Sequence, residues 1–227
     1  MGRVYNLNVT SSIIVVAMLL LIFGDFQESS SSRVLVKARP LLYSSSSRPR
    51  PADAAPFARW LVSHSSWGVL NTIADDMGGA PFGNVVSFSD GQPDSGSGIP
   101  YFYLTTLDPT ATYALKDQRS SFTISEYNIG TCGKKDPENP SCAKITLTGK
   151  LNVLDNKSNE AEYAQNALFS KHPEMEDWPK DHNFQIFKLD IENIFLINWF
   201  GGPKPLTPDE YLHTSLFTSN ENMHFIV

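Results

Sequence analysis

Residues 143–153 alternate between apolar and polar side chains without a break over eleven positions. One set of alternate positions holds only alanine, isoleucine, leucine, glycine and valine, whereas the other holds lysine, threonine and asparagine. Because successive side chains of a β-strand point to opposite faces of a sheet, this pattern predicts a strand with one buried and one solvated face. Such a strand needs partners that cover its apolar face, so the chain is expected to fold around a β-sheet.

Other periodic segments extend this prediction to a mainly β domain of the α+β class. Strand-like runs rich in β-branched and aromatic residues occur at 67–73, 85–88, 99–104, 121–126 and 184–200. Helical spacing and capping signals predict helices at 57–63, 110–116, 159–171 and 207–213. Six strands with few helices favour a small β-barrel closed around an apolar interior.

Turn residues and phase changes predict how these segments are connected. Pro81 is expected in the loop between the first two strands, and Asp90-Gly91 predicts a tight hairpin turn. Pro100 places the start of the following strand at a sheet edge. The alternation within 184–200 changes phase at residues 191–193, which predicts either two strands or one bulged strand.

An apolar segment near the N-terminus has the features of an export signal. Residues 13–23 form an uncharged run of eleven apolar residues behind Arg3. A membrane-spanning helix needs about 20 apolar residues, so this run is short for a span. A basic start followed by such a run is typical of a cleaved signal peptide, assigned here to residues 1–28 with cleavage between Gly24 and Ser32. A buried core helix and an uncleaved anchor are the alternatives.

Residues 29–55 combine two serine runs with an Arg-Pro-Arg-Pro segment. A stretch of this composition buries too little apolar surface to offset its chain entropy, so we expect a disordered spacer. Its Ser/Arg-rich, acid-poor character also suits an organellar transit peptide, but the apolar run ahead of it favours export. The folded domain is then assigned to residues 56–215, and residues 216–227 are expected to form a tail.

Two further features fit an oxidising compartment. Cys132 and Cys142 are the only cysteines and flank a turn-rich polar loop, which favours a disulfide over reduced thiols or a metal site. Asn156 begins an N-glycosylation sequon that follows a predicted strand and is therefore expected in an accessible turn. A second sequon at Asn8 lies in the segment expected to be removed. Together these features predict a glycoprotein of the secretory pathway with no stable membrane span after cleavage.

The charge distribution limits the classes of ligand. Residues 51–227 hold 12 basic and 22 acidic side chains, a net charge of −10, so the folded part is not expected to bind nucleic acid. Residues 60–115 contain no lysine or arginine, although a phosphate-bearing cofactor normally needs basic partners or a helix N-terminus. No catalytic, cofactor-binding or metal-ligating residues are therefore assigned.

The histidines lend themselves to simpler interpretations than catalysis. His172 lies at a predicted helix end, where a cation suits the helix dipole. His172 and His182 lie near acidic residues, but structural roles are favoured over metal ligation. His64 precedes two serines, yet no oriented acid or nucleophile motif accompanies it.

Several long motifs together resemble the CREG (cellular repressor) family of secreted glycoproteins over residues 57–213, essentially the whole folded part. The motifs are VSHSSWGVLNTI (62–73), PFGNVVSFSDG (81–91), GSGIPYFYLTTLD (96–108), the cysteine pair and HPEMEDWPKDHNFQIFKLDIENIFLINWFGGPKPLTPDEY (172–211). The resemblance implies the FMN-binding-type split β-barrel of flavin reductases and pyridoxamine-phosphate oxidases. It also implies a homodimer and an extracellular, lysosomal or vacuolar location.

Members of that family look like oxidases that have lost flavin binding, in agreement with the stretch free of basic residues. We therefore expect a non-enzymatic glycoprotein without a cofactor, which binds an unidentified protein partner in the secretory or endolysosomal system. Its effects on growth or gene expression are then indirect. The main alternative is an FMN- or haem-binding oxidoreductase on the same fold. Another is a trafficking factor that holds a hydrolase or a receptor.

Overall fold

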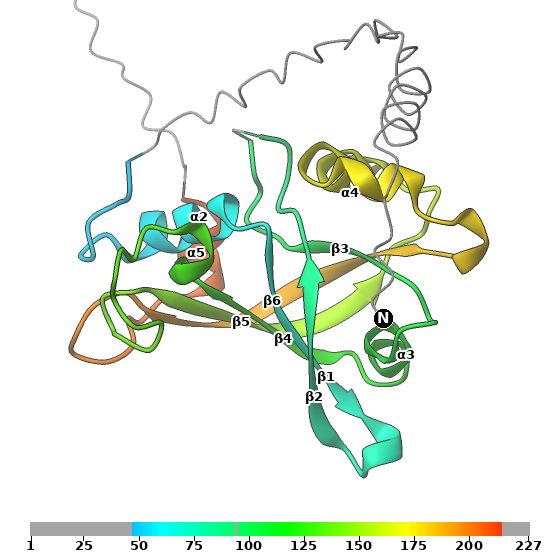
Figure 1. The fold of residues 1–227 in the computed structure, drawn as a ribbon, viewed down its shortest axis with the longest axis horizontal. Coiled ribbons are helices and arrows are strands. Elements are labelled where there is room, and N and C mark those ends of the chain that lie inside the picture. The colour runs from blue at the N-terminus through cyan, green and yellow to red at the C-terminus, as the bar shows by residue number, and fades with distance from the viewer. Residues whose placement is uncertain (1–46, 94, 215–227) are drawn as a thin grey trace, which may run out of the picture. The chain divides into compact units, whose positions relative to one another are not determined.

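A curled, six-stranded antiparallel sheet organises the chain (Figure 1). The computed structural model describes residues 47–93 and 95–214. The strand order is β2-β1-β4-β5-β6-β3. The strands are β1 (Trp67–Ala74), β2 (Ala80–Ser87), β3 (Tyr101–Leu104), β4 (Arg119–Ser125), β5 (Lys144–Val153) and β6 (Gln185–Ile197). A bridge between Ser89 and Tyr101 joins the two edge strands at one end, so the sheet curls into a half-barrel.

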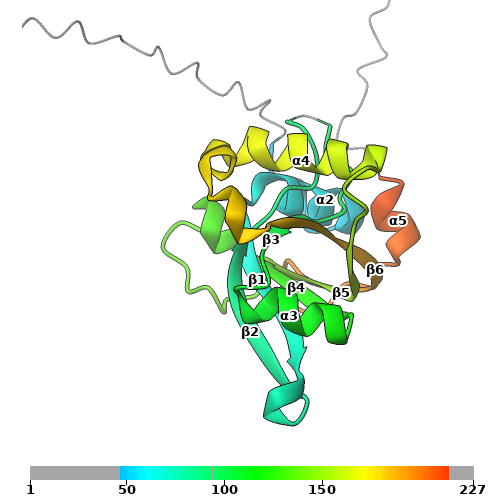
Figure 2. The same ribbon diagram turned by 90° about the vertical axis from the view of Figure 1, so that its right-hand side faces the viewer.

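The helices are short and lie around this sheet (Figure 2). The α-helices are α2 (Ala54–His64), α3 (Pro109–Lys116), α4 (Asn159–Lys171) and α5 (Pro208–Leu212). The 3-10 turns are η1 (Asp75–Met77), η2 (Glu126–Ile129), η3 (Pro173–Asp177) and η4 (Lys180–His182). α5 packs beside α2, and α4 packs against the edge strand β3 and runs directly into η3. All the strands and helices predicted from the sequence are present, with boundaries shifted by a few residues.

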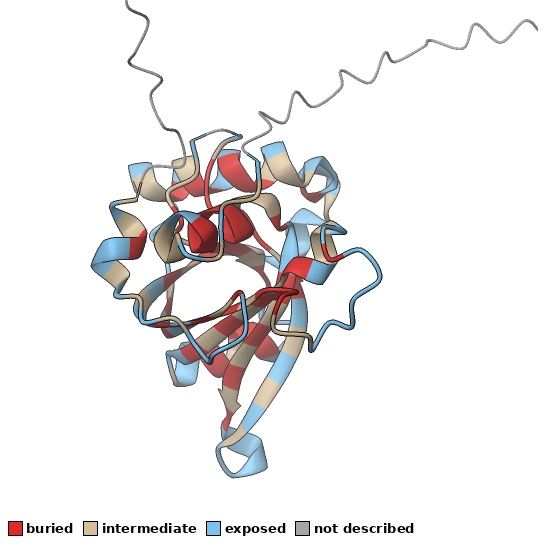
Figure 3. Cartoon of the chain, turned by 90° about the vertical axis from the view of Figure 1, so that its left-hand side faces the viewer, coloured by how far each residue is buried: buried red, intermediate tan, exposed pale blue. Residues whose placement is uncertain are grey.

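The interior of the half-barrel is aromatic. Figure 3 shows buried positions alternating along the strands and continuing into α2. Phe88, Phe102 and Phe122 are fully buried, and each pair of these rings lies 4.8 to 6.4 Å apart between centroids. Such tilted and edge-on contacts stabilise a core beyond the area that they remove from water.

The phase change predicted at residues 191–193 is a β-bulge within one strand. Thr148 opposes Asn193, whereas the next residue, Gly149, opposes Ile191, so Glu192 is the extra residue on β6. A Cβ atom added at Gly149 would lie 1.9 Å from the carbonyl oxygen of Asp190. The glycine in the alternating pattern of β5 is therefore needed for the close approach of the two backbones.

Two sequence predictions about turns are wrong. Pro81 lies within β2 rather than in a loop, and β2 tolerates it because it is an edge strand. Asp90-Gly91 does not form a tight hairpin, since Ser89 pairs with Tyr101 across an eleven-residue connection. Asp90 is instead buried at 2% exposure, and its backbone carbonyl accepts hydrogen bonds from Ser97. Tertiary burial of this aspartate overrides its local turn preference.

The folded part begins earlier than predicted from the sequence. Residues 47–55, expected in the spacer, are described by the structure, and Arg48 forms a two-point ion pair with the buried Glu126. The Arg48 guanidinium also lies 4.7 Å above the ring of Phe57. The predicted signal peptide, spacer residues 29–46 and tail lie outside the described residues. Within the described part, no helix has the length and hydropathy to cross a membrane.

The disulfide between Cys132 and Cys142 is present, with the two Cα atoms 5.2 Å apart. Both cysteines are buried, and the bond closes the loop that leads from η2 into β5. The chain after the bond is held further by Ala143, whose amide donates to the Glu126 carboxylate.

Replacing both cysteines with serine is expected to lower the free energy of unfolding by about 2.7 kcal/mol, because the unfolded loop regains its entropy. The corresponding fall in melting temperature is about 5–10 °C for a domain of this size, measurable by thermal unfolding. Reductant should have the same effect on the native protein and none on the double variant. Equal melting temperatures for both proteins would contradict the prediction.

Candidate functional site

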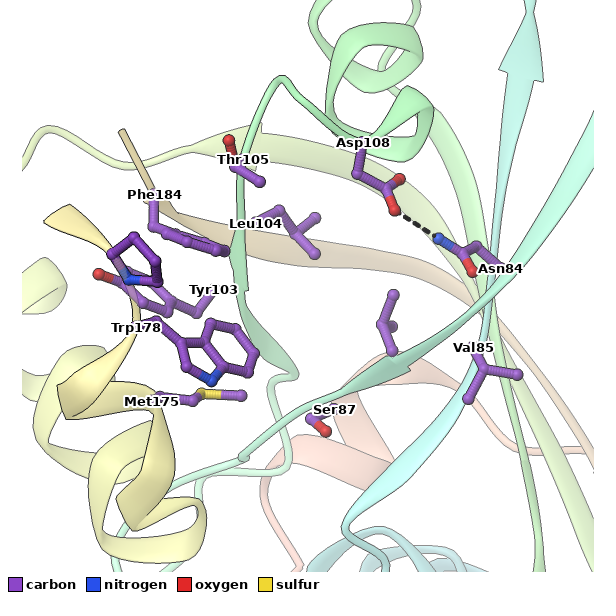
Figure 4. A pocket seen from close by; sticks show the side chains of 12 residues that line it. Asn84, Val85, Ser87, Tyr103, Leu104, Thr105, Asp108, Met175, Trp178 and Phe184 are labelled. Atoms are coloured by element: carbon purple, nitrogen blue, oxygen red, sulfur yellow. Dashed lines mark hydrogen bonds between the residues drawn. The ribbon is translucent and has the colours of Figure 1, made fainter. Parts of the chain in front are cut away.

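An open groove of about 470 Å³ lies between the two edge strands (Figure 4). Beyond the Ser89–Tyr101 bridge, β2 and β3 are not hydrogen-bonded to each other, so residues 84–87 and 103–105 line opposite sides of the gap. The segment that follows α4 closes one side with Met175 and Trp178. The groove thus combines parts of the chain that lie about 90 residues apart in the sequence.

One side of the groove is an aromatic wall formed by Tyr103, Trp178 and Phe184. The Tyr103 ring stacks on Phe184 at 4.8 Å and on Trp178 at 6.0 Å between centroids. The turn η3 ends at Asp177, directly before Trp178, and its Met175 is buried. Stacking fixes the orientation of these rings, so the wall is pre-formed.

Asp108 lies on the opposite side of the groove, at the N-terminus of α3 (Figure 4). Its Oδ1 accepts a hydrogen bond of 2.7 Å from the Thr110 amide, which caps the helix. Its Oδ2 accepts one of 2.9 Å from the Asn84 side-chain amide. Since a carboxylate only accepts, the Asn84 nitrogen faces Asp108, and it donates to Thr110 Oγ1 as well.

The lining does not fit the phosphate of FMN, the cofactor implied by the fold. None of the twelve described residues that line the groove is lysine or arginine. A helix N-terminus would serve as an anion site, but Asp108 already places a carboxylate at the start of α3. Pro109 follows at the first helical position and supplies no N–H. A phosphate in this place would meet a negative charge and no basic side chain from the described lining residues.

A separate cluster of buried charges lies under the connection between β2 and β3. Arg59 is 4% exposed, and its guanidinium donates to the carbonyl oxygens of Gly96, Tyr211, Leu212 and Thr214. It thereby joins α2, α5 and the loop. The sequence offered little to indicate this role beyond a single arginine inside the apolar segment of α2.

Two further ionisable groups complete this cluster. Asp90 Oδ1 lies 3.9 Å from Lys171 Nζ. Burial raises the pKa of Asp90, although the charges of Lys171 and Arg59 oppose the rise. Burial likewise lowers the pKa of Lys171, against the opposing effect of Asp90. These groups hold the loop in place and do not face the groove lining, so we assign them a structural role.

The histidines singled out in the sequence occupy structural positions. His172 is the C-cap of α4, its Nε2 lies 2.9 Å from the Phe88 carbonyl oxygen, and burial lowers its pKa. His64 Nδ1 contacts the Trp60 carbonyl oxygen and Ser63 Oγ near the end of α2. Among the described residues, no group of three or more His, Cys, Asp or Glu side chains could hold a metal ion.

The sequon lies where the sequence predicted it. Asn156 is exposed in the turn between β5 and α4. Ser158, the third residue of the sequon, caps α4 by accepting a hydrogen bond from the Ala161 amide. The attachment of a glycan to Asn156 stays a prediction.

Comparison with known proteins gives a consistent set of relatives. The family model described as "CREG, beta-barrel" matches residues 49–213. Protein CREG1 of Gallus gallus is 43% identical over 169 residues, covering 72% of this chain and 87% of that protein. Protein CREG1 of Homo sapiens is 38% identical over 172 residues, covering 74% of this chain and 77% of that protein. Protein CREG2 of Mus musculus is 37% identical, covering 74% of this chain and 59% of that protein.

Solved structures show the same fold at low sequence identity. A heme binding protein from Mycobacterium smegmatis superimposes with a TM-score of 0.58 and 18% identity. The protein Atu2129 from Agrobacterium tumefaciens superimposes with a TM-score of 0.55 and 20% identity. Each match covers 72% of this chain and 61% of the other, so this chain spans about three fifths of their length. Together with the curled sheet, these matches confirm the predicted split β-barrel.

Proposed function

Because this chain belongs to the CREG β-barrel family, we propose that it is an exported, homodimeric binding protein that uses no phosphorylated cofactor. The observation that carries the proposal is the Asp108 carboxylate at the start of α3, in a groove whose described lining residues include no lysine or arginine. The fold then serves as a rigid scaffold for recognition, and a partner protein in the secretory or endolysosomal system is its target.

Three features support export. The apolar run at residues 13–23 behind Arg3 has the length of a signal-peptide core. The Cys132–Cys142 disulfide is typical of proteins that fold in an oxidising compartment. Asn156 is exposed and therefore open to a glycosyltransferase.

Expression of the full chain in a eukaryotic cell, followed by fractionation and purification, tests this proposal. We expect a mature N-terminus between Gly24 and Ser32, a dimer by light scattering, and no visible absorbance band. Glycosidase treatment should increase the electrophoretic mobility of the protein, and the Asn156→Gln variant should show no such change. Asn166→Gln is the matched control, because Asn166 is exposed on α4 but begins no sequon. Retention in the cytosol or a plastid, or a stoichiometric flavin, would contradict the proposal.

Haem binding is the second candidate, favoured by one observation. The His182 ring stacks on Phe184 at 6.3 Å, so an imidazole lies beside the aromatic wall. Histidine is a common axial ligand of haem iron. The acidic Asp108 argues against it, since haem carries two carboxylates. Added haem whose Soret band shifts when the protein is present, with no shift in the His182→Ala variant, would favour this candidate over the first.

A further inference from the structure

We propose that the groove between β2 and β3 is a binding site for a small arylalkylamine, a flat apolar body that carries a protonated amine. This inference goes beyond the proposed function, because it concerns a small molecule and does not depend on export or on the partner protein. It rests on the aromatic wall, on the Asp108 carboxylate that lies opposite the wall and on the size of the gap between them.

The aromatic wall offers the surface that such a ligand needs. Tyr103, Trp178 and Phe184 hold one another by stacking, so the ligand does not have to order them. All three are half-buried, which leaves part of their surface open to the groove. Aromatic faces attract both flat apolar bodies and organic cations.

Asp108 supplies the negative charge that selects the amine. Its two hydrogen-bond partners, the Thr110 amide and the Asn84 side chain, are both neutral. The carboxylates of Asp75 and Asp117, at the C-terminal end of α3, differ, since each is paired with a cation, Lys116 and Arg119 respectively. Asp108 is half-buried, and none of the other described residues that line the groove is basic. A carboxylate in this position favours a cationic ligand and repels an anionic one.

The body of the groove sets the rest of the ligand's chemistry. The buried side chains of Val86, Leu104 and Met175 contribute an apolar lining to the groove. A volume of about 470 Å³ is in the range of small-molecule pockets. Figure 4 shows Asp108 across the groove from Trp178 and Met175. A bound ring would therefore lie on the aromatic wall while its amine reaches Asp108.

Three indoles of similar size test this inference by calorimetry at neutral pH. The protein is purified in its exported form or, if it is not exported, from cell extracts. Tryptamine carries a positive charge, tryptophol is neutral and indole-3-propionate is negative. We expect tryptamine to bind at least about tenfold more tightly than tryptophol, as an ion pair combined with an aromatic contact allows. Indole-3-propionate is expected not to bind. Equal affinities for the three compounds, or binding of none, would overturn the proposal.

Two variants locate the site. Asp108→Asn keeps a good helix-capping residue, so the fold should survive while tryptamine affinity falls to that of tryptophol. Trp178→Ala should abolish binding of both. Asp75→Asn is the matched control, since this carboxylate lies outside the groove lining and its loss should leave all affinities unchanged. Preference for tryptamine that persists in Asp108→Asn would contradict the assignment of the charge-selecting group.

Discussion

Replacing Gly149 with alanine is expected to lower the free energy of unfolding by more than about 4 kcal/mol, or to prevent folding altogether. The added Cβ would lie 1.9 Å from the Asp190 carbonyl oxygen and 3.1 Å from the Glu192 amide nitrogen. Both obstacles are backbone atoms at the bulge of β6, so no side-chain rotation relieves the clash. The two strands would have to separate at the centre of the sheet. Urea unfolding of the purified variant, or its yield as soluble protein, measures the effect.

Gly83 provides a matched control in another strand. An added Cβ there would meet the Asn71 side-chain oxygen at 2.9 Å, and this amide group can turn aside. Gly83 is exposed on the edge strand β2, so its replacement with alanine should cost less than about 1 kcal/mol. Comparable losses for the two variants would show that the bulge is not the reason for the glycine.

Replacing Arg59 with alanine is expected to cost about 3–5 kcal/mol, because its buried partners lose their donor. The carbonyl oxygens of Gly96 and Leu212 accept hydrogen bonds from Arg59, and an alanine side chain supplies no donor in its place. Arg119→Ala is the control, since Arg119 is exposed and pairs only with its neighbour Asp117. The Arg119→Ala variant should have the same free energy of unfolding as the native protein. A stable Arg59→Ala protein would contradict the account of how α5 is held.

The loss of unfolding free energy in Arg59→Ala should also depend on pH. Arg59 favours the charged form of Asp90, whose pKa is already raised above 3.8 by burial, so its removal raises that pKa further. A raised carboxyl pKa makes the folded state bind more protons, and stability then falls as pH rises from 3.8 through the raised value. The difference between variant and native protein should therefore grow as the pH rises above 3.8 and be largest at neutral pH. In an Asp90→Asn background, this pH dependence should disappear.

Local patterns in the sequence predicted most of the secondary structure. The alternation of β5 identified a strand whose inward side chains, such as Ile145 and Leu147, are fully buried. The capping signals that predicted a helix at 207–213 correspond to a capping box, in which Thr207 and Glu210 form both reciprocal hydrogen bonds. These signals succeed because they depend on neighbours within a few residues, which the sequence shows directly.

Features that depend on distant contacts could not be predicted in this way. The aromatic wall joins Tyr103 to Trp178, and no local pattern marks their stacking. The docking of Arg48 on Glu126 likewise spans 78 residues, so a segment of disordered composition turned out to be part of the domain. The shortage of basic residues was visible in the sequence, but the placement of Asp108 at the groove required the fold.

A titration of the purified protein with FMN tests the central claim most directly. The claim is that Asp108, in a groove with no lysine or arginine among its described lining residues, excludes a phosphorylated cofactor. Flavin fluorescence would report binding as FMN is added to about 1 mM, a concentration that reveals even weak affinity. The account predicts no saturable change. Saturation at one FMN per chain, or recovery of the protein with FMN already bound, would contradict it.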